Sequence, residues 1–495
     1  MAVLIGLKLA LWGVPLFAQS GGSAASFPVL EPDTGAYEFN RRIVSGSSDW
    51  QDLMEIALWA SSVGASPAGG GTAAVRQRIV NAAAEIAGSR ALPEEPRERG
   101  EFILSYMYDK MLKAYSARQT RLDELFSAGR YNCVSSAVLY TILASSVGLD
   151  VRGVMTRDHA FVTVNVGTEL IDVETTNALG FNPGSRREFH DGFGAVTGFA
   201  YVPARNYRDR VSISQVELAS LILSNRIADL ESRGRYDEAV PLAINRAVLL
   251  NGRQDAVSSP FFSDPDNDLM DRLFNYGASL LKAGKESEAL DWSARASARY
   301  PDNERWQEFI YTALNNLMVK SIKAQRIAEA RNLLNLHASG LSPANFERLD
   351  ALALDAELVQ RSAQIKTIVE AEAFLETLDA VQSASRLSQS RITELRTFAL
   401  LKEAELLSAG NGAAAAVAFL EERLARYGAN PRLNDALRVF QSNRVVDIHN
   451  RFADLFNRGN YEEARLTIIA ALEEFPGNRQ LQSDLTMTEQ ALRKR

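Results

Sequence analysis

The sequence predicts an α+β domain with a small antiparallel sheet, followed by an all-α array of helix pairs. Between Gly129 and Gly184 an apolar helical stretch is followed by segments in which apolar and polar residues alternate, as they do in half-buried strands. From about Ser212 onward the alternation ends and a helix-turn-helix pattern recurs. Only 15 prolines occur in 495 residues, which favours helix throughout because proline interrupts helices.

Composition narrows the class of protein. Apolar residues make up 46% of the chain and charged residues 23%, which is ordinary for a globular protein with a real core. The length gives room for about three domains at roughly 150 residues each. The net charge of −7 argues against a nucleic-acid surface, which would be basic. After the first residues no apolar run is long enough to span a bilayer, so we expect no stable membrane span.

Residues 1–20 have the pattern of a secretory signal peptide. Lys8 precedes a ten-residue apolar core from Leu9 to Ala18, and small residues follow it. Such a core is too short to cross a membrane as an anchor. We therefore expect cleavage between Ala18 and Ala25 and a periplasmic or secreted protein. Residues 21–36, rich in Gly, Ser, Ala and Pro, read as a linker.

Residues 37–210 form the predicted α+β domain. Helical periodicity indicates helices over 49–63, 75–87 and 99–116, and a short helical turn over 122–126. A buried helix then begins at residue 133 and ends near Gly148. Strands are expected over 151–155, from 159 to 166 and from 170 to 174, with a turn at Gly167 and Thr168 between the last two.

Cys133 is the only cysteine of the chain. In an exported protein it has no internal partner for a disulfide, which marks it as a candidate reactive thiol. Asn132 is a suitable cap for the helix that begins there. A thiol at a helix N-terminus lies at the positive end of the helix dipole, which favours the thiolate, the form that attacks a carbonyl.

His159 and two carboxylates complete a candidate catalytic set. His159 begins a strand, and Asp172 and Glu174 lie on its predicted partner strand. Residues two apart on a strand share a face, so either Asp172 or Glu174 is placed to orient the imidazole. Asp158 should face the other way and ranks lower. A thiolate nucleophile, an imidazole that exchanges the proton and a carboxylate that fixes its tautomer are the parts of a cysteine hydrolase or acyltransferase.

These residues resemble the transglutaminase-like superfamily, which has a papain-like core. The resemblance covers about Gly129 to Gly184 and places the family's cysteine on Cys133 and its histidine on His159. The family's third residue usually stands in an Asp-x-Thr sequence. Glu174-Thr175-Thr176 matches that pattern with Glu for Asp, while Asp172 supplies the usual residue type two positions early. The resemblance implies acyl transfer from an amide, and an aromatic residue near the histidine, here Phe161.

The other histidines suggest no further site. His190 lies in a predicted loop with Arg186, Arg187 and Asp191, and His337 and His449 lie on predicted helices. No metal-ligand spacing relates them, and no glycine-rich phosphate loop occurs. We expect neither a metal nor a cofactor.

Residues 213–495 are predicted to form helical repeats. The unit from Met270 to Pro301 places Tyr276, Gly277 and Ala289 where the tetratricopeptide repeat has aromatic and small residues. Related turns recur with spacings of about 41 to 50 residues, longer than the 34 of that repeat. Stacked pairs of this kind build a solenoid whose concave face binds a peptide or protein. The predicted turns begin at Gly234, Gly284, Gln325, Lys366, Gly410 and Gly459.

Two functions follow as hypotheses. In the first, an exported cysteine protease, amidase or acyltransferase acts on amide bonds of a protein or peptide, and the repeats select that substrate. Water as acceptor gives hydrolysis, and an amine gives cross-linking. In the alternative, the domain around Cys133 is catalytically inactive, and the chain is an envelope scaffold whose repeats mediate protein–protein interaction. The distance from Cys133 to His159 distinguishes the two.

Overall fold

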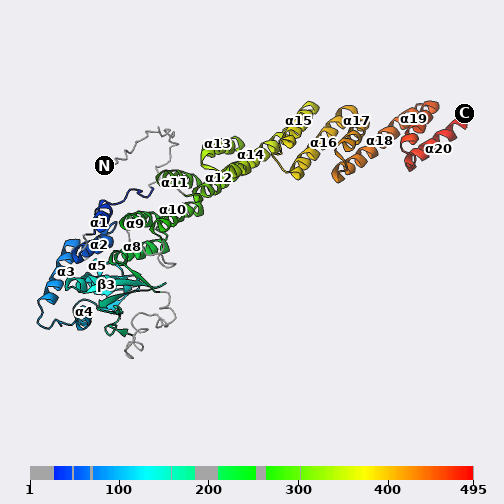
Figure 1. The fold of residues 1–495 in the computed structure, drawn as a ribbon. Coiled ribbons are helices and arrows are strands. Elements are labelled where there is room, and N and C mark those ends of the chain that lie inside the picture. Colours follow the sequence, from blue (N-terminus) through cyan, green and yellow to red (C-terminus); the bar gives the residue numbers. More distant parts are fainter. Residues whose placement is uncertain are drawn as a thin grey trace, which may run out of the picture. The chain divides into compact units, whose positions relative to one another are not determined.

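The computed structural model describes residues 27–46, 49–66, 71–157, 159–183, 210–251, 264–301 and 303–493. The protein is mostly helical with a small antiparallel sheet, as the sequence predicts (Figure 1). It divides into two compact units, Met1–Glu304 and Arg305–Arg495. The expected signal peptide at residues 1–20, and the residues Asp158 and His190, lie outside the described residues.

Six helices in the described part of the chain precede the main sheet of the first unit. Capping side chains and proline define where several of them begin: Asp49 accepts hydrogen bonds from the backbone of Gln51 and Asp52, and Pro96 occupies the first turn of its helix. The helix expected over 99–116 ends earlier, at Lys110. The helices are α1 (Thr34–Val44), α2 (Trp50–Ser62), α3 (Gly71–Ala87), α4 (Pro96–Lys110), α5 (Leu122–Ala128) and α6 (Cys133–Ser146).

The residues after α4 form a strand that the sequence did not suggest. β1 (Ala114–Tyr115) pairs in parallel with β2 (Arg130–Tyr131). The main sheet has the order β5-β4-β3-β6 and is antiparallel throughout. β4 and β5 are neighbours, as predicted, with Thr163 opposite Asp172. The strands of this sheet are β3 (Asp150–Met155), β4 (Ala160–Val166), β5 (Glu169–Val173) and β6 (Val211–Ile213).

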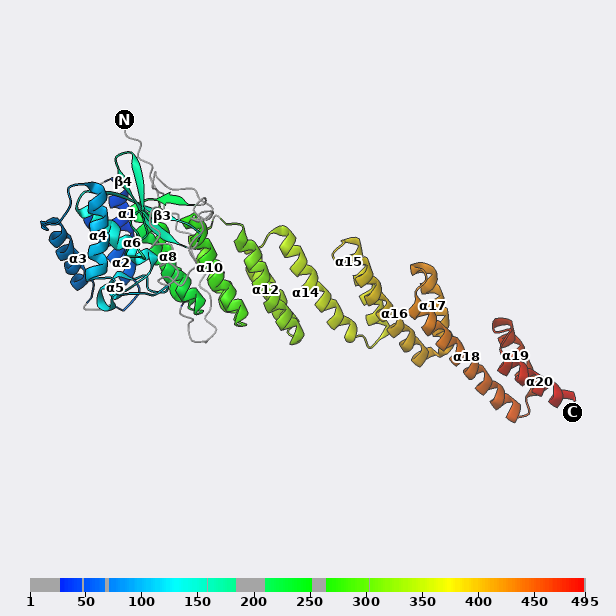
Figure 2. The ribbon, with the colours of Figure 1, turned by 90° about the horizontal axis from the view of Figure 1, so that it is seen from below.

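Helix α6 is the centre of the first unit. Every residue from Val134 to Ala144 is buried, because the helix packs against β3 and β4 on one side and against α2, α4 and α8 on others. Figure 2 shows α2, α6 and α8 side by side. The Tyr140 hydroxyl donates to the Gly100 carbonyl of α4 at 3.0 Å. A helix so enclosed gives its first residue a fixed position.

The first unit extends well beyond residue 210, where the sequence suggested that the α+β domain ends. It includes α8 (Gln215–Ser232), α9 (Tyr236–Leu250), α10 (Pro265–Lys282) and α11 (Glu286–Arg299). α8 contacts α2, α6 and β3, and Arg226 donates to the carbonyls of Ala60 and Val63 at the end of α2. The change of periodicity at Ser212 marks a change of secondary structure and not a boundary in packing.

The predicted linker over 21–36 is structured from residue 27 onward. The Phe27 ring lies 6.2 Å from that of Trp292 in α11. Asp33 caps α1 and accepts a hydrogen bond from the Trp59 indole at 2.9 Å. Its backbone N–H donates to Asn245 in α9. The chain before α1 therefore ties the first helices to the last ones of the same unit.

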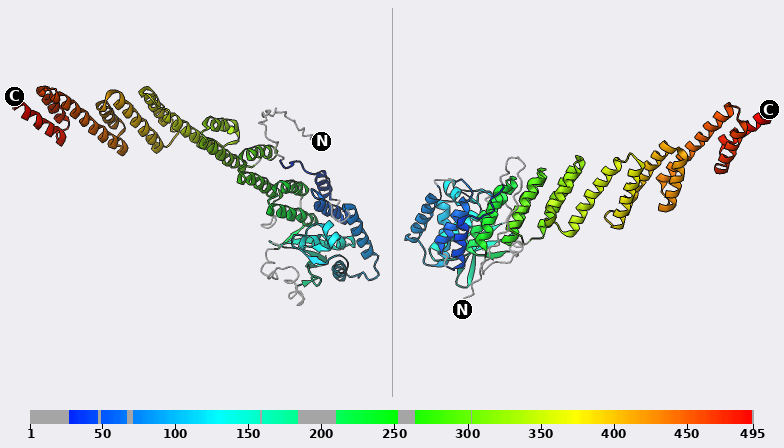
Figure 3. Two further views of the ribbon diagram at one scale, coloured as in Figure 1. Left: turned by 180° about the vertical axis from the view of Figure 1, so that it is seen from behind. Right: turned by 90° about the horizontal axis from the view of Figure 1, so that it is seen from above.

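The second unit consists of consecutive helices, which Figures 1 and 3 show in chain order. Each helix from α12 onward contacts the next one along the chain, and the even-numbered helices also contact one another in succession. Apolar side chains of α14 to α18 form one core cluster and those of α18 to α20 another. The helices are α12 (Arg305–Lys323), α13 (Ile327–His337), η3 (Ala338–Gly340), α14 (Pro343–Ala363), α15 (Ile368–Ser383), α16 (Gln389–Asn411), α17 (Ala413–Tyr427), α18 (Pro431–Asn457), α19 (Tyr461–Glu474) and α20 (Arg479–Arg493).

All six predicted turns lie at the junction of two helices. Gly234, Gly284 and Gly459 have φ values of 74°, 72° and 81°, in the left-handed region that suits glycine. Gln325 occupies the corresponding position between α12 and α13 with a φ of 61°. A non-glycine residue is strained in this conformation. The turn between α12 and α13 therefore keeps the geometry of the other turns although it lacks their glycine.

Candidate active site

Cys133 is the first residue of α6, and its local structure is well defined. Asn132 accepts a hydrogen bond from the backbone N–H of Ser135 at 3.0 Å, and the Ser135 hydroxyl accepts one from the Asn132 backbone at 2.9 Å. This capping box fixes the start of the helix. It also leaves the backbone N–H of Cys133, which has no acceptor within the helix, directed out of the N-terminus. The cysteine itself is partly exposed and not in a disulfide.

His159 stands immediately before β4. Its backbone carbonyl accepts a hydrogen bond from the Thr156 N–H at 2.9 Å, across the connection from β3. Its side chain is 8% exposed, and its ring stacks on that of Phe161 with centroids 6.3 Å apart. The backbone hydrogen bond to Thr156 and the stacking on Phe161 therefore both position the imidazole.

Glu174 binds the imidazole. Its Oε2 lies 2.6 Å from His159 Nε2. Its other oxygen, Oε1, accepts hydrogen bonds from the backbone N–H of Thr176 at 3.2 Å and from the Thr176 hydroxyl at 2.6 Å. The residue is 1% exposed. Both oxygens of this buried carboxylate therefore have hydrogen-bond partners. The bonds from Thr176 to Oε1 hold the carboxylate so that Oε2 faces the imidazole.

The Cys133 thiol interacts with the same imidazole and contributes to raising its pKa. Because Glu174 takes Nε2, Nδ1 is the nitrogen left for the sulfur. Burial by itself would lower the pKa of His159. The charge of Glu174 and the hydrogen bonds from Cys133 and Glu174 outweigh burial, so that the pKa lies well above the ordinary value of 6.5. The geometry therefore favours an imidazolium between a sulfur and a carboxylate.

The turn after β5 fixes Glu174 against α6. The Thr175 hydroxyl lies 2.8 Å from that of Ser136, one turn into the helix from Cys133. The Glu174 N–H donates to the Gly180 carbonyl at 2.8 Å. A Cβ on Gly180 would lie 1.9 Å from the Glu174 carbonyl oxygen, so only glycine allows the turn to close this tightly. The sequence Glu-Thr-Thr thus supplies both the carboxylate and its supports.

Asp172, the other carboxylate left open by the sequence, has a different partner. Arg210 binds it with both terminal nitrogens, at 2.7 and 2.6 Å. The same guanidinium lies 5.1 Å from the centroid of the Phe161 ring. Asp172 therefore supports the stack beneath His159 and does not orient the imidazole. Arg210 follows Asp172 by 38 residues, so periodicity along β5 could not reveal it.

Three tyrosines adjoin the set, and sequence reasoning missed them. The Tyr108 hydroxyl donates to the Thr175 carbonyl and lies 3.1 Å from that of Tyr131. The Tyr115 ring packs edge-on to Tyr131 at 6.0 Å. Burial first, and then the charges of Cys133 and Glu174, raise the pKa of Tyr115. Side chains with neutral phenol hydroxyls therefore lie beside the thiol. The only hint of these tyrosines in the sequence was Tyr131, which lies two positions before Cys133.

No group of three or more potential ligand side chains among the described residues is arranged to hold a metal ion. His449 Nδ1 contacts the buried Asp484 at 2.7 Å between α18 and α20, which is a packing contact of the second unit. His337 ends α13. Within the described ranges, none of the helices combines the length and the apolar character needed to cross a membrane.

No known protein-family model matches the chain, and no curated protein matches it.

Proposed function

We propose that the protein is a cysteine enzyme that transfers the acyl group of an amide, with Cys133 as nucleophile, His159 as proton carrier and Glu174 as the group that orients it. The observation that carries the proposal is one imidazole that hydrogen-bonds a buried carboxylate at 2.6 Å and whose pKa is raised by the neighbouring Cys133 thiol. A structural cysteine needs neither partner. Cysteine, histidine and Glu-Thr-Thr in this order are also what the resemblance to the transglutaminase-like superfamily implies.

The first half-reaction uses the groups as they stand. With its proton already on His159, the Cys133 thiolate attacks the amide carbon and forms the C–S bond, and the carbonyl electron pair moves onto oxygen. The backbone N–H of Cys133, free at the helix N-terminus, donates to the developing oxyanion. The imidazolium of His159 then gives its proton to the leaving nitrogen, the C–N bond breaks, and an amine departs. A thioester on Cys133 remains, with a neutral imidazole beside it.

The second half-reaction decides the product. His159 removes a proton from water or from an amine, which attacks the thioester carbon. The C–S bond breaks, the thiolate returns, and the proton stays on the imidazole. Water yields a carboxylate, and an amine yields a new amide. Glu174 keeps Nε2 in place through both steps, because its own second oxygen is held by Thr176.

The helix pairs from α12 onward are proposed to bind the protein or peptide substrate. Successive contacts between even-numbered helices are what a stacked repeat array requires. We further propose that the protein is exported, on the pattern of residues 1–20. A periplasmic or secreted enzyme would meet proteins or wall peptides with accessible amides.

The proposal is tested with a mixture of tryptic peptides as substrates and dansylcadaverine as an amine acceptor. The wild-type chain should either attach the amine to peptides or create new peptide ends in their mass spectra. The Cys133→Ala variant, which removes only the sulfur, serves as the control and should do neither. Equal product from both chains would exclude Cys133 as the nucleophile. The ratio of amine-labelled to hydrolysed peptide separates acyltransferase from protease or amidase.

A further inference from the structure

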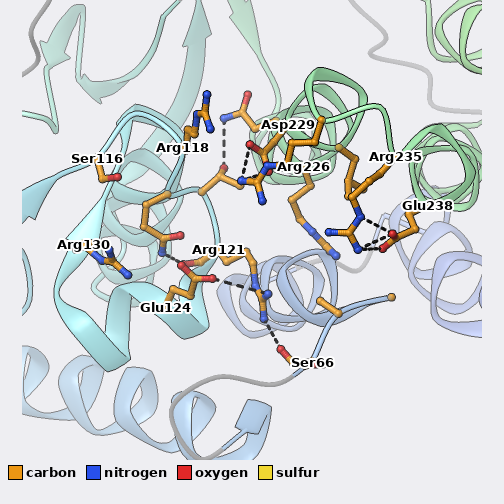
Figure 4. A pocket seen from close by; sticks show the side chains of 17 residues that line it. Ser66, Ser116, Arg118, Arg121, Glu124, Arg130, Arg226, Asp229, Arg235 and Glu238 are labelled. Atoms are coloured by element: carbon orange, nitrogen blue, oxygen red, sulfur yellow. Dashed lines mark hydrogen bonds and ion pairs between the residues drawn. The ribbon is translucent and has the colours of Figure 1, made fainter. Parts of the chain in front are cut away.

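A cavity of about 480 Å³ lies in the first unit, lined by the segments after α2 and after β1 and by α5, β2, α8 and α9. Its lining is unusually rich in arginine (Figure 4). It belongs to no part of the mechanism proposed above. The arginines that line it are Arg118, Arg121, Arg130, Arg226, Arg233 and Arg235.

Three of these arginines have carboxylate partners. Arg121 binds Asp123 through Nε at 3.0 Å. Arg233 binds Asp229, and Arg235 binds Glu238 with two nitrogens. These pairs are structural and neutral overall. They shape the wall of the cavity but leave little charge for a ligand.

The other three arginines are not neutralised. Arg226 donates to two backbone carbonyls at 2.6 and 2.7 Å, which hold it in place without cancelling its charge. Arg118 and Arg130 are exposed and have no hydrogen-bond or ion-pair partner among the described residues, and neither carries a dashed line in Figure 4. Glu124, the remaining lining carboxylate, pairs with Arg121 at 3.8 Å, so the six arginines have four carboxylates near them: Asp123, Glu124, Asp229 and Glu238. The cavity therefore has a surplus of two positive charges.

Arg226 shows that two guanidinium groups of the lining lie close enough to repel each other. Burial first, and then the charge of Arg121, lower the pKa of Arg226 to about 10. Burial disfavours the charged guanidinium, the neighbouring Arg121 adds repulsion, and the charge of Asp123 offsets part of it. An anion in the cavity would relieve this repulsion. The whole chain has a net charge of −7, so the positive surplus is local and not a property of the surface in general.

We propose that this cavity binds a small, multiply charged oxyanion, with Arg118 and Arg130 as its principal contacts. Guanidinium forks match phosphate and carboxylate oxygens in pairs. The volume lies in the range of small-ligand sites, about 300–1,000 Å³. The carboxylates of Glu124, Asp229 and Glu238 around the arginines disfavour a long polyanion, which would have to pass them. The proposal is independent of the chemistry at Cys133.

The cavity is connected to the segment before Cys133. Arg130 lies in β2, three positions before the cysteine. The loop that carries Arg118 is fastened to the start of α6, since Asn132 donates to the Ala117 carbonyl at 3.2 Å and Ser135 donates to that of Gln119. A ligand in the cavity would therefore contact the same backbone that positions the thiol.

Isothermal titration of the full chain with pyrophosphate, and separately with citrate, tests the proposal. We expect one site per chain for at least one of the two, and the stronger ligand tells phosphate from carboxylate chemistry. The double variant Arg118→Gln/Arg130→Gln should weaken binding about 100-fold, at roughly tenfold for each lost charge-assisted contact. Arg90→Gln, which changes an exposed arginine outside the cavity lining, should bind as wild type does.

Three results would overturn the proposal. The first is no binding of either anion at millimolar concentration. The second is unchanged affinity in the double variant. The third is an equal loss in Arg90→Gln, which would show that net charge and not the cavity governs binding. Tight binding of an acidic peptide, with neither small anion bound, would likewise replace a small-molecule site with a docking site for a polypeptide.

Discussion

His159 and Glu174 meet across neighbouring strands, with Nε2 2.6 Å from Oε2, and the carboxylate is 1% exposed. Each residue also has a second neighbour: the Cys133 thiol acts on the imidazole and raises its pKa, and Thr176 fixes the carboxylate with two hydrogen bonds. A buried carboxylate is costly unless its hydrogen bonds are complete. Here the hydrogen bonds to Glu174 all serve to hold Nε2 of the imidazole. Nδ1 is then left for the sulfur of Cys133.

The first prediction concerns the charge of His159. Its pKa should lie well above 6.5, because the attraction of Glu174 and the bonds from Cys133 and Glu174 exceed the effect of burial. Glu174→Gln removes that attraction and should lower the pKa, whereas Asp172→Asn should change it little because Asp172 binds Arg210. The four histidines can be followed by NMR titration of histidine-labelled protein. A larger shift in Asp172→Asn than in Glu174→Gln would reverse the roles of the two carboxylates.

The same charge has a consequence for stability. A raised pKa in the folded state means that protonation of His159 favours folding at pH values below the ordinary histidine pKa. This contribution is lost as the pH rises through the raised value. Urea unfolding of the wild-type chain and of Glu174→Gln should therefore converge toward alkaline pH, once the imidazole of both is neutral.

The second prediction concerns the boundary of the first unit. A chain ending at residue 304 keeps α8 against α2, α6 and β3 and should fold with a reactive Cys133. A chain ending at residue 212 loses α8, whose Leu218, Ala219, Ile222 and Leu223 are fully buried. The burial of each large apolar side chain contributes about 1.5–3 kcal/mol, so the shorter chain should not fold. Circular dichroism and thermal melting compare the two. A cooperative melt of the shorter chain at the same temperature would place the boundary at 212 after all.

The third prediction concerns the turn between α12 and α13. Gln325 has a φ of 61°, a conformation that costs a non-glycine residue about 1–2 kcal/mol. Gln325→Gly should stabilise the second unit by about 1 kcal/mol after the entropy of glycine is deducted. Gln364→Gly is the matched control, since Gln364 follows the last residue of α14 as its C-cap with a φ of −93°. There the glycine should destabilise. Urea unfolding that showed the same sign for both changes would contradict the strain.

The fourth prediction concerns export. Mature protein recovered from the cell envelope or the medium should begin at one of residues 19 to 25, after cleavage between Ala18 and Ala25. Mass spectrometry of the N-terminal peptide reads this directly. A replacement of the apolar core, such as Leu11→Arg with Leu16→Arg, should retain the full-length chain inside the cell. An envelope protein that still carries residue 2 would show that the segment is not removed.

Local patterns in the sequence were sufficient for part of this structure. The helix that begins at Cys133, its Asn132 cap and the pairing of the strands after His159 and before Glu174 follow from periodicity and turn residues within about 45 positions. The six turns between helices follow in the same way. Each depends on residues that are close along the chain, where spacing determines which side chains share a face.

What the sequence left open depends on residues far apart in it. Periodicity puts Asp172 and Glu174 on one face of β5, and only Arg210 separates their roles. The first unit reaches Glu304 because α8 to α11 pack onto α1, α2 and the chain at Phe27. The arginine-lined cavity gathers residues from Gly64 to Glu238. No spacing rule connects such positions before the chain is folded.

The fifth prediction tests the central claim, that Cys133 and His159 form one nucleophilic unit. Because the chain has one cysteine, intact mass spectrometry of iodoacetamide labelling at pH 6 measures the reactivity of Cys133 alone. The wild-type thiol should react faster than the same thiol in urea-unfolded chain, and His159→Ala should slow it by about 10- to 100-fold, the worth of a hydrogen bond to a charged group. His337→Ala, in the second unit, should label as wild type does. Equal rates in wild type and His159→Ala would contradict the account.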